Sequence, residues 1–244
     1  AGRRIFFKKK KINFKNKFST VGEKHNDTFL GYYDICNFSF DEKKILFHQK
    51  PHNEKYVNIS IYDMEKKISK KYDISYAWSW QLGCRIKWIS DKEFIFNTLD
   101  DQNYLVSKSI NYENNSEKFY PFSFFSISNN CKYAINLNFN KLEKNRPGYG
   151  YLFSQKNFND NDNYIFIWNI ESKKIEHLFD QNFFKNYMNK VFDDFYFNHA
   201  SWSPNNTDFI IYLIDKFSRK NKILFFKKFE NLEIINEIDM ISHH

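Results

Sequence analysis

Short apolar stretches alternate with short polar turns along most of the chain. One arrangement recurs, in which an apolar stretch, a turn rich in Asp, Asn and Ser, and a second apolar stretch follow one another. The apolar residues are mainly β-branched or aromatic, which favours strands over helices. Asp and Asn suit the turns because their side chains bond to nearby backbone groups. The pattern predicts β-hairpins at residues 38–47, 88–96, 125–135 and 202–211.

Each predicted hairpin is followed by another stretch in which polar and apolar residues alternate, at 57–63, 104–110, 164–170 and 223–229. A short turn and one more strand then complete the repeat, as at 173–179. Four strands in a repeat of about 40–50 residues are typical of a β-propeller blade. We therefore predict an all-β fold, a β-propeller of four-stranded antiparallel blades. An ordinary β-sandwich with accidental internal similarity is the alternative.

The distribution of charge predicts a basic N-terminal tail at 1–24. The repeats predict a propeller domain at 25–244, with about four complete blades and the start of a fifth at 240. An open stack of blades would leave unpaired strand edges. Either residues 1–33, with a strand near 12–18, close the ring, or further blades follow the C-terminus. We expect the second arrangement, because the chain stops where another hairpin would begin. The four blades are expected at approximately 34–75, 77–120, 121–180 and 196–238.

Two long excursions interrupt the repeats. Residues 140–163 include Gly148 and Gly150, in a chain that has only 6 glycines. Such a pair predicts tight backbone geometry that other residues cannot adopt. Residues 180–197 are rich in aromatic residues and Asn, and we expect a short helix near 183–191. Loops of this kind usually form the binding face of a propeller.

Charge and cysteine content narrow the functional classes. Residues 1–24 have a net charge of +8, and the remaining residues are neutral overall. A nucleic-acid partner is not expected, because such a protein spreads basic groups over a folded face. No apolar run approaches the length of a transmembrane helix. Cys36, Cys84 and Cys131 show no paired spacing, which favours a reducing compartment, and we expect a cytoplasmic location.

Several motifs near the expected blade boundaries resemble those of a family. They are Gly31-Tyr-Tyr-Asp34, Trp78-Ser-Trp-Gln-Leu-Gly-Cys-Arg85, Arg146-Pro-Gly-Tyr-Gly-Tyr151, Asn198-His-Ala-Ser-Trp-Ser-Pro204 and Ser242-His-His244. Over residues 25–244 the set resembles a group of poorly characterised bacterial propellers associated with surface-polysaccharide genes. More distantly, the chain is similar to oligogalacturonate lyase and to the propeller domain of TolB. The resemblance implies the fold but leaves the activity open.

The lyase resemblance also implies one divalent transition metal held by histidines. His199 matches one position, and His243 or His244 matches another. Neutral imidazole suits Mn, Fe, Zn or Ni. The glutamine that would complete the set is not identifiable in this chain. Alternatively, His199 bonds to the backbone at the start of a blade, and His243 and His244 belong to a purification tag.

Three residues are candidate catalytic groups. The chain has few arginines, and the planar fork of Arg85 or Arg146 can bind a carboxylate or a phosphate through two hydrogen bonds. Their alternative role is to brace a loop. Asp34 is a candidate base at the entry to the first blade, and capping of the turn is its alternative role. No nucleophile elbow or phosphate-binding glycine loop is present.

Candidate substrate-binding residues lie in the same motifs: Tyr33, Trp78, Gln81 and Tyr149. Tyr and Trp rings provide flat surfaces for a sugar, although Trp in a strand is more often buried in the core. We expect a carbohydrate-active or carbohydrate-binding propeller of bacterial surface-glycan metabolism. If it is an enzyme, it is a metal-assisted lyase that acts on an acidic saccharide by β-elimination. The alternative is a non-catalytic scaffold that binds a protein or a glycan.

Overall fold

The computed structural model describes residues 21–188, 194–229 and 231–234, and strands dominate it. The strands form four-stranded antiparallel sheets in which each strand pairs with the next one in the chain. The first sheet contains β1 (Asn26–Phe29), β2 (Lys44–Pro51), β3 (Val57–Asp63) and β4 (Ile68–Ser75), and the second contains β5 (Lys87–Trp88), β6 (Glu93–Leu99), β7 (Leu105–Asn111) and β8 (Glu117–Tyr120). The third contains β9 (Ser126–Ile127), β10 (Tyr133–Leu137), β11 (Ile165–Asn169) and β12 (Lys174–Phe179), and the fourth contains β13 (Phe195–Trp202), β14 (Phe209–Asp215), β15 (Asn221–Lys227) and β16 (Asn231–Ile234). The predicted four-stranded antiparallel blades are confirmed.

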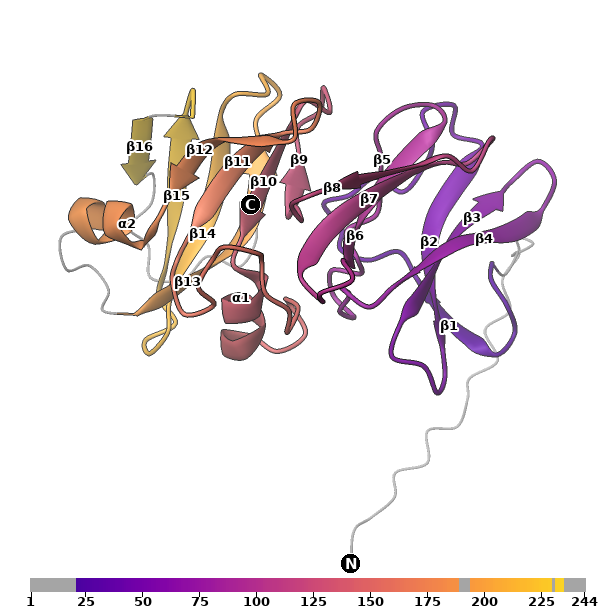
Figure 1. The fold of residues 1–244 in the computed structure, drawn as a ribbon, viewed down its shortest axis with the longest axis horizontal. Coiled ribbons are helices and arrows are strands. Elements are labelled where there is room, and N and C mark those ends of the chain that lie inside the picture. The colour runs from indigo at the N-terminus through magenta and orange to yellow at the C-terminus, as the bar shows by residue number, and fades with distance from the viewer. Residues whose placement is uncertain (1–20, 189–193, 230, 235–244) are drawn as a thin grey trace, which may run out of the picture.

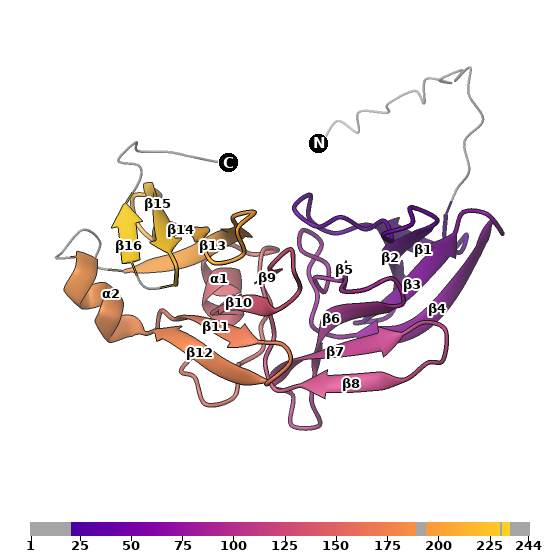
Figure 2. The same ribbon diagram turned by 90° about the horizontal axis from the view of Figure 1, so that it is seen from above.

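The four sheets follow one another along an arc (Figures 1 and 2). In Figure 2, β5 and β9 lie toward the inside of the arc, and β4, β8 and β12 lie toward the outside. The first blade begins with β1 and so includes residues before position 34, where the repeat placed its start. The strand expected near 12–18 and the fifth blade expected from 240 lie outside the described residues.

The hairpin turns show why Asp and Asn recur in the repeat. In the first blade, the Asp41 carboxylate accepts a hydrogen bond from the backbone N–H of Lys43 at 3.1 Å. In the third, Asn130 accepts one from the backbone N–H of Lys132, also at 3.1 Å. The residue after each of these turn residues has a left-handed backbone, as do other turn residues in the chain. Local side-chain chemistry therefore fixes the position of each hairpin.

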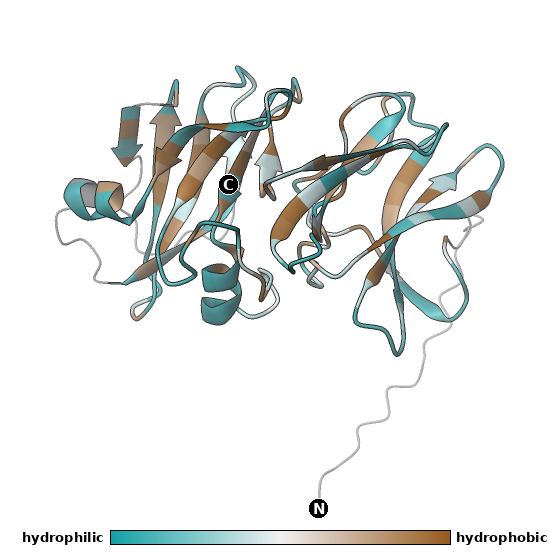
Figure 3. Cartoon of the chain, in the orientation of Figure 1, coloured by the Kyte–Doolittle hydropathy of each residue, from teal (hydrophilic) through white to brown (hydrophobic). Residues whose placement is uncertain are grey.

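The hydrophobic core lies between neighbouring blades. Phe94 and Phe96 of β6 pack with apolar residues of the first blade, whereas Ile95 packs with those of the third. Successive side chains of a strand point to opposite faces of its sheet, so a blade with a neighbour on each side needs apolar residues on both faces. Figure 3 shows the resulting hydrophobic stretches along the central strands. The separate cores explain why these strands are almost continuously apolar.

Two helices lie in the excursions. α1 (Phe139–Asn145) was not predicted; Asn138 caps it by accepting a hydrogen bond from the backbone N–H of Lys141 at 2.8 Å. α2 (Gln181–Met188) agrees with the helix expected near 183–191 but starts earlier. In the described part of the chain, neither helix has the length and apolar character needed to cross a bilayer.

Candidate functional site

An irregular segment interrupts or precedes the first strand of three blades. β1 and Phe38 pair with opposite ends of β2, so residues 30–37 loop out between them. Residues 76–86 form a similar excursion between β4 and β5. In the fourth blade, the pairing of β13 with β14 shifts between Asn198 and Ser201, which produces a bulge of the kind often found beside functional sites. Six predicted site residues lie in these segments: Tyr33, Asp34, Trp78, Gln81, Arg85 and His199.

Arg85 and Asp34 form a bidentate ion pair. The Arg85 Nη1 atom lies 2.9 Å from Asp34 Oδ1, and Nη2 lies 2.7 Å from Oδ2. The Arg85 side chain is 1% exposed and that of Asp34 is 18% exposed, and the guanidinium lies 4.5 Å from the centre of the Phe125 ring. Both carboxylate oxygens are therefore already hydrogen-bonded. A catalytic role for either residue, which stays a prediction, would require this pair to open.

Arg85 and His199 occupy equivalent positions in two blades. Each precedes a Trp by three residues, Trp88 in the second blade and Trp202 in the fourth. The backbone φ is 60° at Arg85 and 52° at His199. A left-handed conformation is uncommon for residues other than Gly, although His adopts it more readily than Arg, and such strained positions cluster at functional sites. This shared backbone geometry was not expected from the sequence, although the common spacing to Trp was visible.

A cluster of aromatic side chains surrounds Tyr32. Its hydroxyl lies 3.4 Å from His199 Nε2, and its ring stacks on the His199 ring with 5.2 Å between centres. The Tyr33 ring lies 4.5 Å from that of Tyr32, and the Tyr149 ring lies 6.4 Å away in an edge-on arrangement. Tyr32 is buried, and burial raises its pKa, so its hydroxyl keeps its proton. Tyr33 is 59% exposed and presents the cluster to solvent.

Arg146 lies over this tyrosine cluster, which we define as Tyr32, Tyr33 and Tyr149. The carbon at the centre of its guanidinium is 4.0 Å from the centre of the Tyr149 ring. Among the described residues, no carboxylate or other acceptor makes an ion pair or hydrogen bond with this guanidinium. Arg146 therefore differs from Arg85: the Arg85 fork is bound by Asp34, whereas no residue in the described part of the chain uses the donors of the Arg146 fork.

The loop that carries Arg146 and Tyr149 is held by Glu143. The Glu143 carboxylate accepts hydrogen bonds from the backbone N–H groups of Gly148 and Gly150 at 2.9 Å. Gly148 has a φ of 90°. At Gly150, an added Cβ would lie 2.3 Å from the Phe139 carbonyl oxygen, so no larger residue fits. The tight backbone geometry expected from this glycine pair is confirmed.

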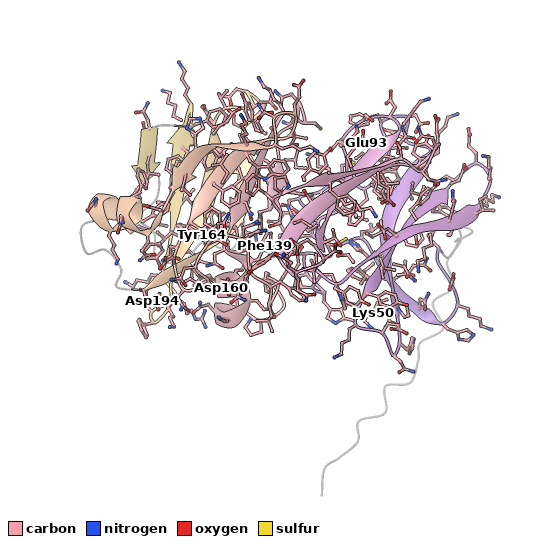
Figure 4. The ribbon with its side chains drawn as sticks, in the orientation of Figure 1. Lys50, Glu93, Phe139, Asp160, Tyr164 and Asp194 are labelled. Atoms are coloured by element: carbon pink, nitrogen blue, oxygen red, sulfur yellow. The ribbon has the colours of Figure 1, made fainter. Side chains whose placement is uncertain are left out.

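Trp78 packs against rings other than those of the tyrosine cluster. Trp78 Nε1 donates to the Lys55 carbonyl oxygen at 2.8 Å, and its ring contacts Trp80, with 5.1 Å between ring centres. The Lys50 ammonium, labelled in Figure 4 on the half formed by the first two blades, lies 5.8 Å from the Trp78 ring. Gln81 is exposed. Within the described residues, no ring contact connects Trp78 with the tyrosine cluster, and the substrate-binding roles of Trp78 and Gln81 stay predictions.

Two adjoining cavities lie where the blades converge. The smaller, the axial cavity, has a volume of about 180 Å³ and is lined by residues from all four blades. The larger, the hairpin cavity, has a volume of about 750 Å³ and lies against hairpin turns of the first and third blades. Three residues line both cavities: Asp34, Lys87 and Asn129. Lys87 was not recognised in the sequence, because a lone Lys in a lysine-rich chain carries no signal.

The predicted metal site is only partly within the described residues. Among the residues that the structure describes, no group of three or more His, Cys, Asp and Glu side chains is placed to hold a metal ion. His199 lies between Tyr32 and Tyr212, whose pKa is raised to about 12 by burial. His243 and His244 lie outside the described residues. The described part of the predicted set supplies a single imidazole, so the metal stays a prediction and no step below depends on it.

Comparisons with known proteins relate the chain to others through its fold. No protein-family model and no curated protein sequence matches it. The structure of TolB from Acinetobacter baumannii is similar over 88% of this chain and 45% of its own, at 10% identity and a TM-score of 0.51. A prolyl endopeptidase structure is similar over 87% of this chain and 29% of its own, at 13% identity and a TM-score of 0.52. Oligogalacturonate lyase from Vibrio parahaemolyticus is similar over 91% of this chain and 69% of its own, at 11% identity and a TM-score of 0.45.

Four antiparallel four-stranded sheets around one axis, together with these similar structures, define the class: the chain is a β-propeller. It spans less than half the length of the TolB structure. At such low identities the similarity shows the fold alone, because one propeller fold supports many unrelated functions.

Proposed function

We propose that this propeller binds an acidic saccharide at the tyrosine cluster, with the sugar carboxylate held by Arg146. The free fork of Arg146 is the observation that carries the proposal. A guanidinium presents parallel N–H donors whose spacing matches the oxygens of a carboxylate. Its stacking on Tyr149 holds the fork in place without using its donors.

The neighbouring rings suit the body of a sugar. Tyr33 is largely exposed and has a hydroxyl and a flat apolar face, so it can contact both the polar and the C–H surfaces of a pyranose. Tyr32 is buried beneath it and remains protonated, which makes it a hydrogen-bond donor rather than a competing negative charge. The site therefore combines one cation with neutral aromatic surfaces, which favours a uronate over a neutral sugar.

The geometry supports binding more strongly than elimination. β-Elimination from a uronate requires a base that removes the proton beside the carboxylate, while the bond to the leaving oxygen breaks and a carbon–carbon double bond forms. Both oxygens of Asp34, the predicted base, accept hydrogen bonds from the Arg85 guanidinium. We therefore place the non-catalytic binding role first. A lyase activity, a surface-glycan pathway and a cytoplasmic location remain predictions from the sequence.

Calorimetric titration with trigalacturonate, and with the neutral oligomer galactotriose as the control ligand, tests the proposal. We expect saturable binding of the acidic oligomer alone. Charge-assisted hydrogen bonds are worth about 1.5–3 kcal/mol, so Arg146→Ala should weaken binding by about 10- to 100-fold. Arg146→Lys keeps the charge but not the fork and should give an intermediate loss. Tyr76→Ala serves as a control, because it removes an exposed tyrosine that lies outside the tyrosine cluster.

Two results would contradict this function. The first is equal affinity for the acidic and neutral oligomers, and the second is unchanged affinity in the correctly folded Arg146→Ala variant. Incubation of the same trigalacturonate with the protein also tests the lyase prediction, because elimination produces an unsaturated sugar that absorbs in the ultraviolet.

A further inference from the structure

The hairpin cavity is separate from the tyrosine cluster and is not used by the proposed saccharide site. Its volume of about 750 Å³ lies within the usual range for small-molecule sites. One wall is formed by Phe38 and Phe40 of the first hairpin, and Met64 and Trp88 complete the apolar lining. Trp88 Nε1 donates to the Asn37 carbonyl oxygen at 3.0 Å, which fixes the orientation of its ring.

The aromatic wall is accessible to a ligand. Phe38 is 46% exposed and Phe40 is 61% exposed, although both belong to a well-formed hairpin. The hairpin is held by Ser39, whose hydroxyl donates to Asp41 at 2.6 Å. The two Phe rings are thus presented on a fixed turn, and a flat apolar ligand would remove their surface from water.

Lys87 supplies a positive charge at the junction of this cavity with the axial cavity. Its ammonium donates to the Ile127 carbonyl oxygen at 2.8 Å. Among the described residues, no carboxylate forms an ion pair with Lys87, and the nearby Asp34 is paired with Arg85. Burial lowers the pKa of Lys87, and the neighbouring Arg85 charge lowers it further, whereas the Asp34 carboxylate opposes this only in part.

An anion of the ligand would provide an ion-pair partner for Lys87. An ammonium has three donors, and the Ile127 carbonyl uses one of them. Glu42 also lines the cavity, but it is exposed, so solvent screens its charge. The available charge complementarity therefore favours a ligand with a single acidic group rather than several.

We propose that the hairpin cavity binds a small planar aromatic acid, with its ring against Phe38 and Phe40 and its acidic group on the Lys87 ammonium. The site opens beside the hairpin turns, whereas the saccharide site lies at the tyrosine cluster. The two proposals involve different residues and different ligands.

Titration with the fluorescent aromatic sulfonate 1-anilinonaphthalene-8-sulfonate tests this proposal on the intact chain. We expect a saturable increase in fluorescence, and Lys87→Met should weaken binding by about tenfold or more. Lys87→Arg should retain most of the affinity, and Phe40→Ala should weaken it. Lys174→Met and Phe217→Ala are the controls, because both replace exposed side chains that do not line the hairpin cavity. The urea midpoint of each variant identifies those that bind the dye only because they are partly unfolded.

A thiol measurement on the unaltered protein provides an independent test. Cys36 and Cys131 line the hairpin cavity, whereas Cys84 is buried elsewhere. Bound dye should slow the alkylation of Cys36 by iodoacetamide, read by mass spectrometry of its peptide. Unchanged dye affinity in folded Lys87→Met, or unchanged Cys36 alkylation at saturating dye, would overturn the proposal. Because the uronate and dye titrations use different probes and variants, either proposal can fail without the other.

Discussion

Removal of the Asp34 carboxylate should destabilise the protein strongly, because it leaves Arg85 charged and without a partner. Arg85 is 1% exposed, and the two hydrogen bonds of 2.9 and 2.7 Å to Asp34 are the only ones its guanidinium makes with a carboxylate in the described chain. Breaking a buried ion pair typically costs about 3–5 kcal/mol. Asp34 is 18% exposed, so water can partly replace it. We therefore expect Asp34→Ala to lower the free energy of unfolding by about 3 kcal/mol, at the lower end of that range.

Urea unfolding followed by tryptophan fluorescence measures this loss. Glu113→Ala is the control, because the Lys92–Glu113 pair has the same 2.7 Å separation but side chains that are 58% and 47% exposed. An exposed pair contributes about 0.2–1 kcal/mol at most. The contrast between the two variants therefore isolates the effect of burial from that of distance.

The double variant Asp34→Ala/Arg85→Met completes the cycle. It removes the buried charge together with its partner, so it should be more stable than Asp34→Ala alone. The reasoning is refuted if Asp34→Ala unfolds at the same urea concentration as Glu113→Ala. It is also refuted if the double variant is less stable than Asp34→Ala, because the loss would then come from packing rather than from an uncompensated charge.

Two further predictions concern stability. Burial lowers the pKa of His48 to about 4, and its Nε2 accepts the Cys84 backbone N–H at 3.1 Å, so the folded protein holds a neutral ring. The unfolded state binds the proton more readily, so stability should fall as pH drops from about 6.5 to 4, by on the order of 3 kcal/mol. Between pH 6.5 and 4, the urea midpoint should fall less in His48→Gln than in the unaltered protein, and as much as in the unaltered protein in His52→Gln. An equal pH dependence of the midpoint in all three proteins would contradict the prediction. Gly150→Ala should lower the free energy of unfolding by about 2–3 kcal/mol, because the added Cβ would clash with the Phe139 carbonyl oxygen. Gly148→Ala should lower it by about 1 kcal/mol, because the added Cβ would meet open space and only the φ of 90° is unfavourable. Thermal unfolding should rank the two variants in that order, and the reverse order would show that backbone conformation outweighs the clash.

Local sequence determined the strands and their turns. The alternating stretch at 57–63 became β3 (Val57–Asp63), and each predicted hairpin formed. These features depend on side-chain alternation and on Asp and Asn bonding to backbone within a few residues, so neighbouring residues suffice to specify them. The tight backbone at Gly148 and Gly150 could be predicted for the same reason. By contrast, α1 was not predicted, because its short segment is stabilised by burial of Phe139 and Leu142 in the core.

Only the tertiary structure decided which candidate residues meet. Arg85 and Asp34 are 51 positions apart in the chain, and Tyr32 and His199 are 167 apart, yet each pair is in contact. No local pattern encodes such a meeting, because it depends on how the blades turn about their axis. The structure also separates two arginines that were equivalent candidates in the sequence: Asp34 neutralises Arg85, whereas none of the described residues accepts a hydrogen bond from the Arg146 guanidinium. Residue types can be read from the chain, but the partner that satisfies each buried charge is set by packing between blades.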